Sequence, residues 1–198
     1  MVRAMEFHAS SADEALEICR QLVRNGQANL FRGQTQDWPK ITPSLHRIIK
    51  EEQDKAIQEL KMFEEWSGSD PGMAVYRHKK EAITAIAQHF QIPTSFLDMT
   101  TSPEIALLFA KSSSETDDHK FESVIYCFTE EMLKTLPGGK LIKIEVSNLW
   151  RLEAQKGLFL QFLNEELSDI LPKHTIKVYF PSCKSTAHEQ IKLYPARK

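Results

Sequence analysis

The chain has 198 residues, of which 41% are hydrophobic and 26% charged, and its formal net charge is −2. This composition is typical of a globular protein with one domain and a sizeable core. The net charge does not support a nucleic-acid partner, although a local basic patch stays compatible with one. No run approaches the roughly 20 apolar residues that span a bilayer. Residues 1–11 lack the apolar core of an export signal, so we expect a cytoplasmic protein without membrane contact.

The first half of the chain is predicted to be mainly helical. Ser11 and Glu14 have capping-box spacing and start an apolar stripe that ends at Asn25-Gly26. A short strand follows over residues 28–33, and longer helices are expected over 48–66 and 74–90.

The second half is predicted to be mainly β. Strands are expected over residues 122–128, 141–146, 176–180 and 188–194, with a short helix over 164–171. Helices followed by strands indicate an α+β fold with a mainly antiparallel sheet, not a doubly wound α/β fold. The three cysteines, at positions 19, 127 and 183, lack CxxC spacing, so we interpret them as reduced thiols and predict no metal site.

Polar side chains concentrate between Gln88 and Ser102, directly before an apolar helix. Thr101 or Ser102 can cap that helix, and Thr101-x-x-Glu104 has capping-box spacing. A polar strand end that meets a helix N-terminus brings free amides and a positive dipole to one place. The stretch therefore predicts a binding site.

Arg32 and Gly33 end the predicted strand over residues 28–33. An arginine here can act as an anion fork, and the glycine would let a ligand approach the backbone. The structural alternative is an edge-strand arginine in a surface ion pair. Similarly, Asp98, Gln88 and Gln155 could form a polar network that holds loops around the core.

Three segments resemble the FRG domain family, which is widespread in bacteria and their phages. The first is Phe31-Arg32-Gly33-Gln34, followed by Trp38 and Pro43-Ser44-Leu45-x-Arg47. The second runs from Gln88-His89-Phe90 through Leu97-Asp98-x-Thr100 to Phe109-Ala110, and the third is Arg151-x-x-x-Gln155-x-Gly157-x-Phe159. The resemblance implies a single FRG domain over 1–198, with an N-terminal helix in 1–27 and a helix and strands in 160–198. Gln91 and Met99 replace the glycine and tryptophan usual in the family, which would reshape the pocket wall.

A more distant similarity links the chain to ADP-ribosyltransferases of the Arg, Ser-Thr-Ser, Glu class. Phe31-Arg32-Gly33 is similar to their first motif, Thr100-Thr101-Ser102 with the following helix to their second, and His188 to Pro195 to their third. The resemblance implies a split, ADP-ribosyltransferase-like sheet and an enzyme that uses NAD to modify a protein or nucleic acid, as toxin or defence effectors do. Together the two resemblances imply catalytic roles for Arg32, His89 and either Glu189 or Gln190, according to the register of the last strand. Together they imply NAD contacts from Arg32, Gly33, Gln34, Trp38, Gln88, Asp98, Thr100, Thr101, Ser102 and Gln155.

Two other functions stay open at this point. If Gln190 holds the acid position, the charge is lost, which favours a noncatalytic module that binds a nucleotide, nucleic acid or protein in the same cleft. A nuclease acting through His89 and Arg32 ranks last, because no motif supplies the second catalytic histidine or the metal-binding carboxylate cluster that such a reaction usually needs.

Overall fold

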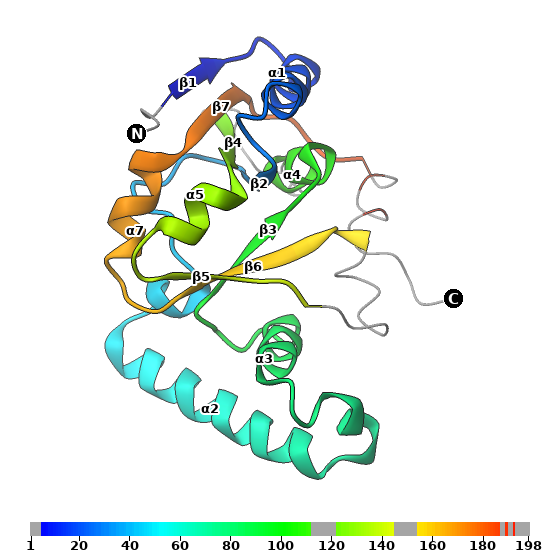
Figure 1. The fold of residues 1–198 in the computed structure, drawn as a ribbon, viewed down its shortest axis with the longest axis vertical. Coiled ribbons are helices and arrows are strands. Elements are labelled where there is room, and N and C mark those ends of the chain that lie inside the picture. Colours follow the sequence, from blue (N-terminus) through cyan, green and yellow to red (C-terminus); the bar gives the residue numbers. More distant parts are fainter. Residues whose placement is uncertain (1–4, 112–121, 145–153, 187–188, 190–191, 193–198) are drawn as a thin grey trace.

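The computed structural model describes residues 5–111, 122–144, 154–186, 189 and 192. Over these residues the chain forms an α+β fold around a seven-stranded sheet of order β1-β7-β4-β2-β3-β6-β5 (Figure 1). Among the described strands only β1 and β7 pair in parallel, so the predicted fold class with its mainly antiparallel sheet is confirmed. The strands are β1 (Met5–His8), β2 (Leu30–Gln34), β3 (Phe96–Thr100), β4 (Glu122–Phe128), β5 (Gly139–Ile142), β6 (Gly157–Phe162) and β7 (Ile176–Pro181).

The sheet divides into two halves that meet between β2 and β3. These strands share one register pair, Phe31 opposite Thr100, whereas β2 and β4 share five pairs and β3 and β6 another five. Beyond that pair the facing edges of β2 and β3 lack strand partners. Backbone groups at an unpaired edge need other partners, so the divide is where side chains or a ligand can bind the backbone.

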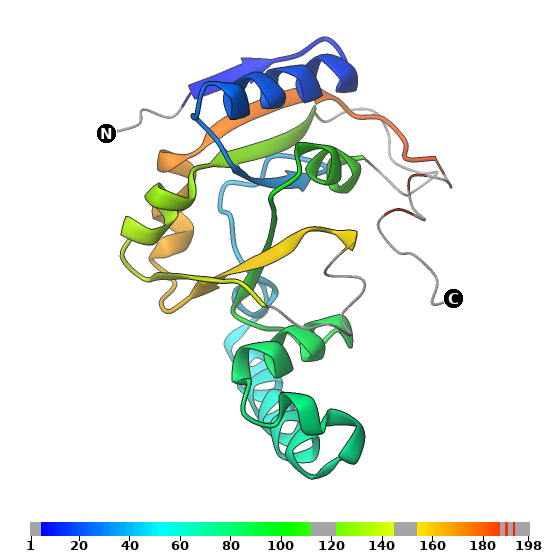
Figure 2. The same ribbon diagram turned by 45° about the vertical axis from the view of Figure 1, so that its right-hand side comes forward.

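Helices cover both faces of the sheet (Figures 1 and 2). On one face, α1 (Ala12–Arg24) and α4 (Pro103–Ala110) pack on β2, β4 and β7 through a shared apolar cluster. On the other face, α5 (Glu130–Thr135) and α7 (Leu167–Ile170) enclose the largest cluster. Ser11 caps α1 by accepting the Glu14 amide, as predicted.

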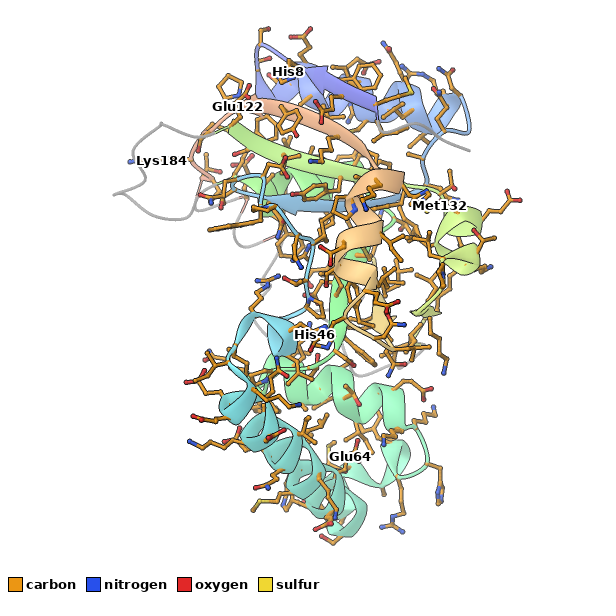
Figure 3. All side chains as sticks on the ribbon, turned by 90° about the vertical axis from the view of Figure 1, so that its left-hand side faces the viewer. His8, His46, Glu64, Glu122, Met132 and Lys184 are labelled. Carbon is orange, nitrogen blue, oxygen red and sulfur yellow. The ribbon has the colours of Figure 1, made fainter. Side chains whose placement is uncertain are left out.

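A helical arm extends from the β3-β6-β5 half of the sheet (Figure 2). It consists of α2 (Lys50–Ser69), the 3-10 helix η2 (Pro71–Tyr76) and α3 (Lys80–His89). The 3-10 helix η1 (Ser44–Arg47) leads into it, and η3 (Leu171–His174) follows α7. His46 of η1 lies where the arm meets the sheet, with its ring 5.9 Å from that of Phe162 (Figure 3).

Several predicted boundaries were wrong for local reasons. The helix expected over 74–90 begins only at Lys80, because Asp70 accepts the Gly72 amide and starts a separate 3-10 turn. The helix expected over 164–171 is split into α7 and η3, with Pro172 in the first turn of η3. Strand β1 was not predicted, and its four residues gain their partners from β7, 171 positions later in register.

The strand predicted over residues 188–194 is also wrong at the two positions that the structure describes. Glu189 and Lys192 are helical. Thr186 and Glu189 form a reciprocal cap, in which the Glu189 amide donates to Thr186 Oγ1 at 3.2 Å and the Thr186 amide to Glu189 Oε2 at 2.8 Å. This capping box favours a helix start over a strand. Gln190, the other predicted acid position, lies outside the described residues, as do the loop 112–120 and residues 145 and 146.

No helix in the described ranges is long and apolar enough to cross a membrane.

Asp37 ties the loop after β2 to the sheet. Its Oδ1 accepts from Tyr126, and its Oδ2 accepts from Tyr179 and Lys177, each at 2.7 Å. Burial acts to raise the pKa of Asp37, but the hydrogen bonds from Lys177, Tyr179 and Tyr126 together outweigh it and hold the pKa below its usual value. The carboxylate is therefore favoured in the folded state.

We expect Asp37→Asn to lower the free energy of unfolding at neutral pH, by about 1–3 kcal/mol if the lost charge leaves Lys177 without its partner. Since the folded-state pKa is depressed, this stabilisation is present above the unfolded pKa of about 4 and is lost as the pH falls through the folded value. Urea titrations at pH 7 and about pH 3 should show the gap between wild type and variant shrinking in acid. Asp54→Asn, at an exposed ion pair with Lys50, is the control and should change little.

Candidate functional site

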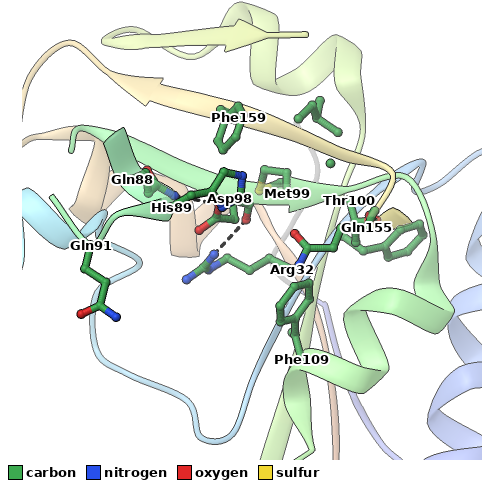
Figure 4. Close-up of a pocket in the computed structure, with 14 residues that line it drawn as sticks. Arg32, Gln88, His89, Gln91, Asp98, Met99, Thr100, Phe109, Gln155 and Phe159 are labelled. Atoms are coloured by element: carbon green, nitrogen blue, oxygen red, sulfur yellow. Dashed lines mark hydrogen bonds between the residues drawn. The ribbon is translucent and has the colours of Figure 1, made fainter. Parts of the chain in front are cut away.

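A pocket of about 360 Å³ lies at the divide between the two halves of the sheet (Figure 4). Seven of the predicted site residues line it: Arg32, Gly33, Gln88, His89, Asp98, Thr100 and Gln155. Its apolar wall consists of Phe31, Met99, Phe109, Leu158 and Phe159. The pocket thus brings together all three sequence segments, from β2, from the end of α3 with β3 and α4, and from the approach to β6.

Strand alternation assigns a separate role to each residue of Phe31-Arg32-Gly33. Phe31 is fully buried in the cluster that α4 covers. Gly33 lies on the same face, and a Cβ there would come within 1.8 Å of the Ala106 carbonyl oxygen of α4. Arg32, between them, belongs to the opposite face of the strand. The glycine was predicted to let a ligand approach, but what approaches its backbone most closely is helix α4.

Arg32 extends across the divide to β3. Its Nη1 donates to the Asp98 carbonyl at 2.8 Å, which satisfies a backbone oxygen that faces no strand on that side (Figure 4). This is the one hydrogen bond that the guanidinium makes to the described residues, and Arg32 Nε is buried without a partner among them. Burial lowers the pKa of Arg32, the negative charge of Asp98 raises it, and the positive charge of Arg47 lowers it further. The group stays protonated, so the site holds a half-buried cation with unused donors.

A chain of hydrogen bonds connects the motifs behind the pocket. Ser44 Oγ accepts the Thr94 amide at 3.1 Å, and the Thr94 hydroxyl, which itself accepts from the Phe96 amide, donates to Gln88 Oε1. Gln88 Nε2 then donates to Asp98 Oδ1 at 2.8 Å. These bonds fix the orientation of the Gln88 amide and aim the Asp98 carboxylate. Gln88 and Asp98 therefore form the network expected in the structural alternative, while they also line the pocket.

The hydroxyl-rich segment before α4 is used mainly within the fold. Thr100 Oγ1 donates to the Gln155 carbonyl at 2.7 Å and accepts the Ser102 amide at 3.1 Å. Ser102 caps α4 by accepting the Ile105 amide and donates to Glu104 Oε2 at 2.7 Å. The cap is therefore Ser102, and the predicted capping box of Thr101 with Glu104 is wrong. Thr101 and Ser102 do not line the pocket.

The two departures from the family pattern lie at the pocket wall. Gln91 has φ 67°, a left-handed conformation that glycine adopts without strain. The backbone at this position explains why the family has glycine there. Met99 is buried in the main core as well as lining the pocket.

Other predicted site residues lie elsewhere. Trp38 is 52% exposed, and neither it nor Gln34 lines the pocket. Glu189 forms an ion pair with Lys111 at 2.7 Å, with the two side chains 22% and 15% exposed respectively. The hydrogen bond from Lys111, with that from the Thr186 amide, holds the pKa of Glu189 below its usual value. Glu189 is thus an ionised structural carboxylate outside the pocket.

A second hollow of about 320 Å³ shares a wall with the first. Arg32, Gln88, Gln91 and Asp98 line both, and Ser44 and Arg47 line the second. Arg47 was part of a recognised motif but was not predicted to belong to the site. The sequence gives no local signal that Arg47 lies beside Arg32, because the loop that connects them is irregular.

Residues 27–119, nearly half of the chain, match the family model of the FRG domain. This range includes the first two motifs, and with them Arg32 and Arg47. The third motif lies outside the matched range. The comparison with curated proteins and the comparison with solved structures each found no match.

Proposed function

Because the chain carries an FRG domain over residues 27–119, whose motifs converge on one pocket, we propose that this pocket binds a nucleotide and that the nucleotide is NAD. The observation that carries the proposal is the half-buried Arg32 side chain, whose Nε is buried and whose guanidinium makes one hydrogen bond to the described residues. A partly desolvated cation with unused donors costs free energy that an anionic ligand would offset. A planar guanidinium binds phosphate oxygens through two parallel bonds, which a lysine cannot do.

The apolar wall supports a ligand that carries a ring as well as an anion. Phe31, Phe109 and Phe159 line the pocket together with Gln88 and Asp98. Flat aromatic side chains suit a base or a nicotinamide, and a few polar groups among apolar ones fix its orientation. A pocket of 360 Å³ is near the lower end of the range of about 300–1,000 Å³ for small-molecule sites. It therefore fits one nucleoside end of NAD better than the whole dinucleotide.

A second candidate function, ADP-ribosyl transfer, is favoured by Asp98. Its side chain is exposed and lines the pocket, and Gln88 Nε2 holds one carboxylate oxygen. When the C1′–N bond to nicotinamide breaks, the bonding electron pair leaves with the nicotinamide and positive charge develops on the ribose. A carboxylate stabilises that charge and can take the proton of the attacking water or acceptor hydroxyl. We assign this role to Asp98 in place of Glu189, which is held by Lys111 outside the pocket.

The test is to titrate NAD into wild type and Asp98→Asn while following binding by calorimetry and free nicotinamide by chromatography. We expect both proteins to bind NAD, because the asparagine keeps an oxygen for Gln88. If Asp98 stabilises the transition state, release of nicotinamide should fall by about 100-fold or more in the variant. Glu189→Gln is the matched control and should keep the wild-type rate.

The outcomes separate the two functions. Binding without release in wild type would leave a nucleotide-binding module and exclude transfer to water. Equal release by wild type and Asp98→Asn would remove the role assigned to Asp98, and loss of release in Glu189→Gln would restore the acid role to that residue. If NAD does not bind to wild type at all, the proposal is wrong.

A further inference from the structure

Arg47 gives the second hollow a chemistry that the pocket beside it lacks. Both hollows have Arg32 and Asp98 in their walls, but only the second adds another arginine. Arg32 and Arg47 line the same hollow, and the positive charge of Arg47 acts to lower the pKa of Arg32. Two cations held near each other, with one carboxylate in the shared wall, favour an occupant with more than one negative charge.

The backbone around Arg47 holds its side chain in place. Its Nε and Nη2 both donate to the Thr42 carbonyl, at 2.9 and 2.6 Å, and Nη1 makes no hydrogen bond to the described part of the chain. Ser44 and Leu45 of the same 3-10 helix bind Thr94, since the Leu45 amide donates to the Thr94 carbonyl at 3.1 Å and Ser44 Oγ accepts the Thr94 amide. The loop that carries Arg47 is therefore attached to the segment that carries Gln88 and Asp98. An arginine positioned in this way loses little side-chain entropy when it binds an anion.

We infer that the second hollow is a diphosphate subsite, in which Arg47 and Arg32 bind the two phosphates of a nucleotide whose ring end occupies the first hollow. This inference rests on the proposed function and deepens it by assigning the two ends of the ligand. It also explains the size of the first hollow, because a dinucleotide needs both spaces. Asp98, in the shared wall, repels the phosphates and is aimed at the sugar between them and the ring.

Inorganic pyrophosphate is the direct probe, because it carries the diphosphate without sugar or base. We expect pyrophosphate to bind wild type and to bind Arg47→Gln at least 10-fold more weakly, since a charge-assisted bond is lost. Glutamine keeps a donor for the Thr42 carbonyl, so the loop should stay in place, and thermal unfolding checks this. Arg47→Lys keeps the positive charge but loses the planar guanidinium. Its affinity for pyrophosphate should lie between those of wild type and Arg47→Gln. Arg77→Ala, which removes an exposed arginine that lines neither hollow, is the control for net charge.

Asp98→Asn is expected to change the affinity for pyrophosphate in the direction opposite to Arg47→Gln. Removing the carboxylate should tighten pyrophosphate binding, because the repulsion from the shared wall is lost while the Arg32 contact to the backbone carbonyl remains. The salt dependence should be steeper for wild type than for Arg47→Gln, because fewer charges are screened in the variant. A variant that does not fold would instead lose affinity for every ligand tested.

The results distinguish this inference from the proposed function. If NAD binds and both NAD and pyrophosphate bind Arg47→Gln as tightly as wild type, the subsite is wrong while the nucleotide pocket stands. If pyrophosphate binds with the expected dependence on Arg47 but NAD and nucleosides do not bind, the subsite stands and the nucleotide proposal is wrong. If pyrophosphate does not bind wild type, the inference is overturned.

Discussion

Replacing Gly33 by alanine is expected to destabilise the protein severely. The added methyl carbon would lie 1.8 Å from the Ala106 carbonyl oxygen and 2.8 Å from the Ala110 nitrogen. Both atoms belong to the backbone of α4, so neither can swing away as a side-chain end would. Either β2 or α4 has to move, which separates Phe31 from its cluster and shifts Arg32 at the divide. Overpacking usually costs about 1–3 kcal/mol, and we expect at least the upper value here.

Gly68→Ala is the matched control, since it adds the same methyl group in helix α2. No heavy atom lies within 4 Å of the Cβ position there, and alanine favours a helix over glycine. The control should stabilise the protein by up to about 1 kcal/mol. Urea unfolding followed by circular dichroism measures both variants. A destabilisation of Gly33→Ala below about 1 kcal/mol would mean that α4 does not pack on the strand this closely.

Arg32→Lys is expected to weaken NAD binding by about 10- to 100-fold, from a hydrogen bond to a charged group worth about 1.5–3 kcal/mol. Lysine keeps the positive charge but has no planar fork, so it cannot bind the Asp98 carbonyl and a phosphate together with the same geometry. The protein should remain folded, because the change leaves the Phe31 and Gly33 face of the strand unaltered. Calorimetric titration with NAD and with pyrophosphate should show losses for both ligands.

Arg20→Lys is the control for losing a guanidinium fork without altering the pocket. Arg20 binds Glu104 Oε1 through Nε at 3.1 Å and Nη2 at 3.0 Å, and this pair is about half exposed. Its ligand affinity should match that of wild type, and its stability should change by less than about 1 kcal/mol. If Arg32→Lys also binds both ligands like wild type, Arg32 binds no anion and its role is limited to the contact with the Asp98 carbonyl.

Local patterns predicted the elements whose signals lie within a few residues of each other. The capped start of α1 and the extent of β4 follow from cap residues and apolar spacing, and the cap of α4 is Ser102, one of the two residues that the sequence left open. The same local rules misplaced the capping box at Thr101, because Glu104 binds Ser102 and Arg20 instead. They also gave a strand where Thr186 and Glu189 form a cap. In both cases a side chain had two partners within reach, and the pattern alone did not decide between them.

The candidate site shows a similar division. The FRG resemblance located Arg32, Gln88, Asp98, Thr100 and Gln155, and the structure places all of them around one pocket. It did not reveal that Gln88 and Asp98 serve both as a network and as the pocket wall. The resemblance included Arg47 in a motif but did not assign it to the site, because the loop between Arg32 and Arg47 is irregular.

The sequence by itself determined the fold class, the cap of α1 and seven of the residues that line the pocket. These features depend on the alternation of a strand, the period of a helix and motifs that combine rare side chains. Only the tertiary structure decided that Gly33 accommodates α4, that Glu189 pairs with Lys111 and that Arg47 joins Arg32. Each of these depends on which segments, distant in the chain, pack together. That choice is made by burial of the whole core and not by any local pattern.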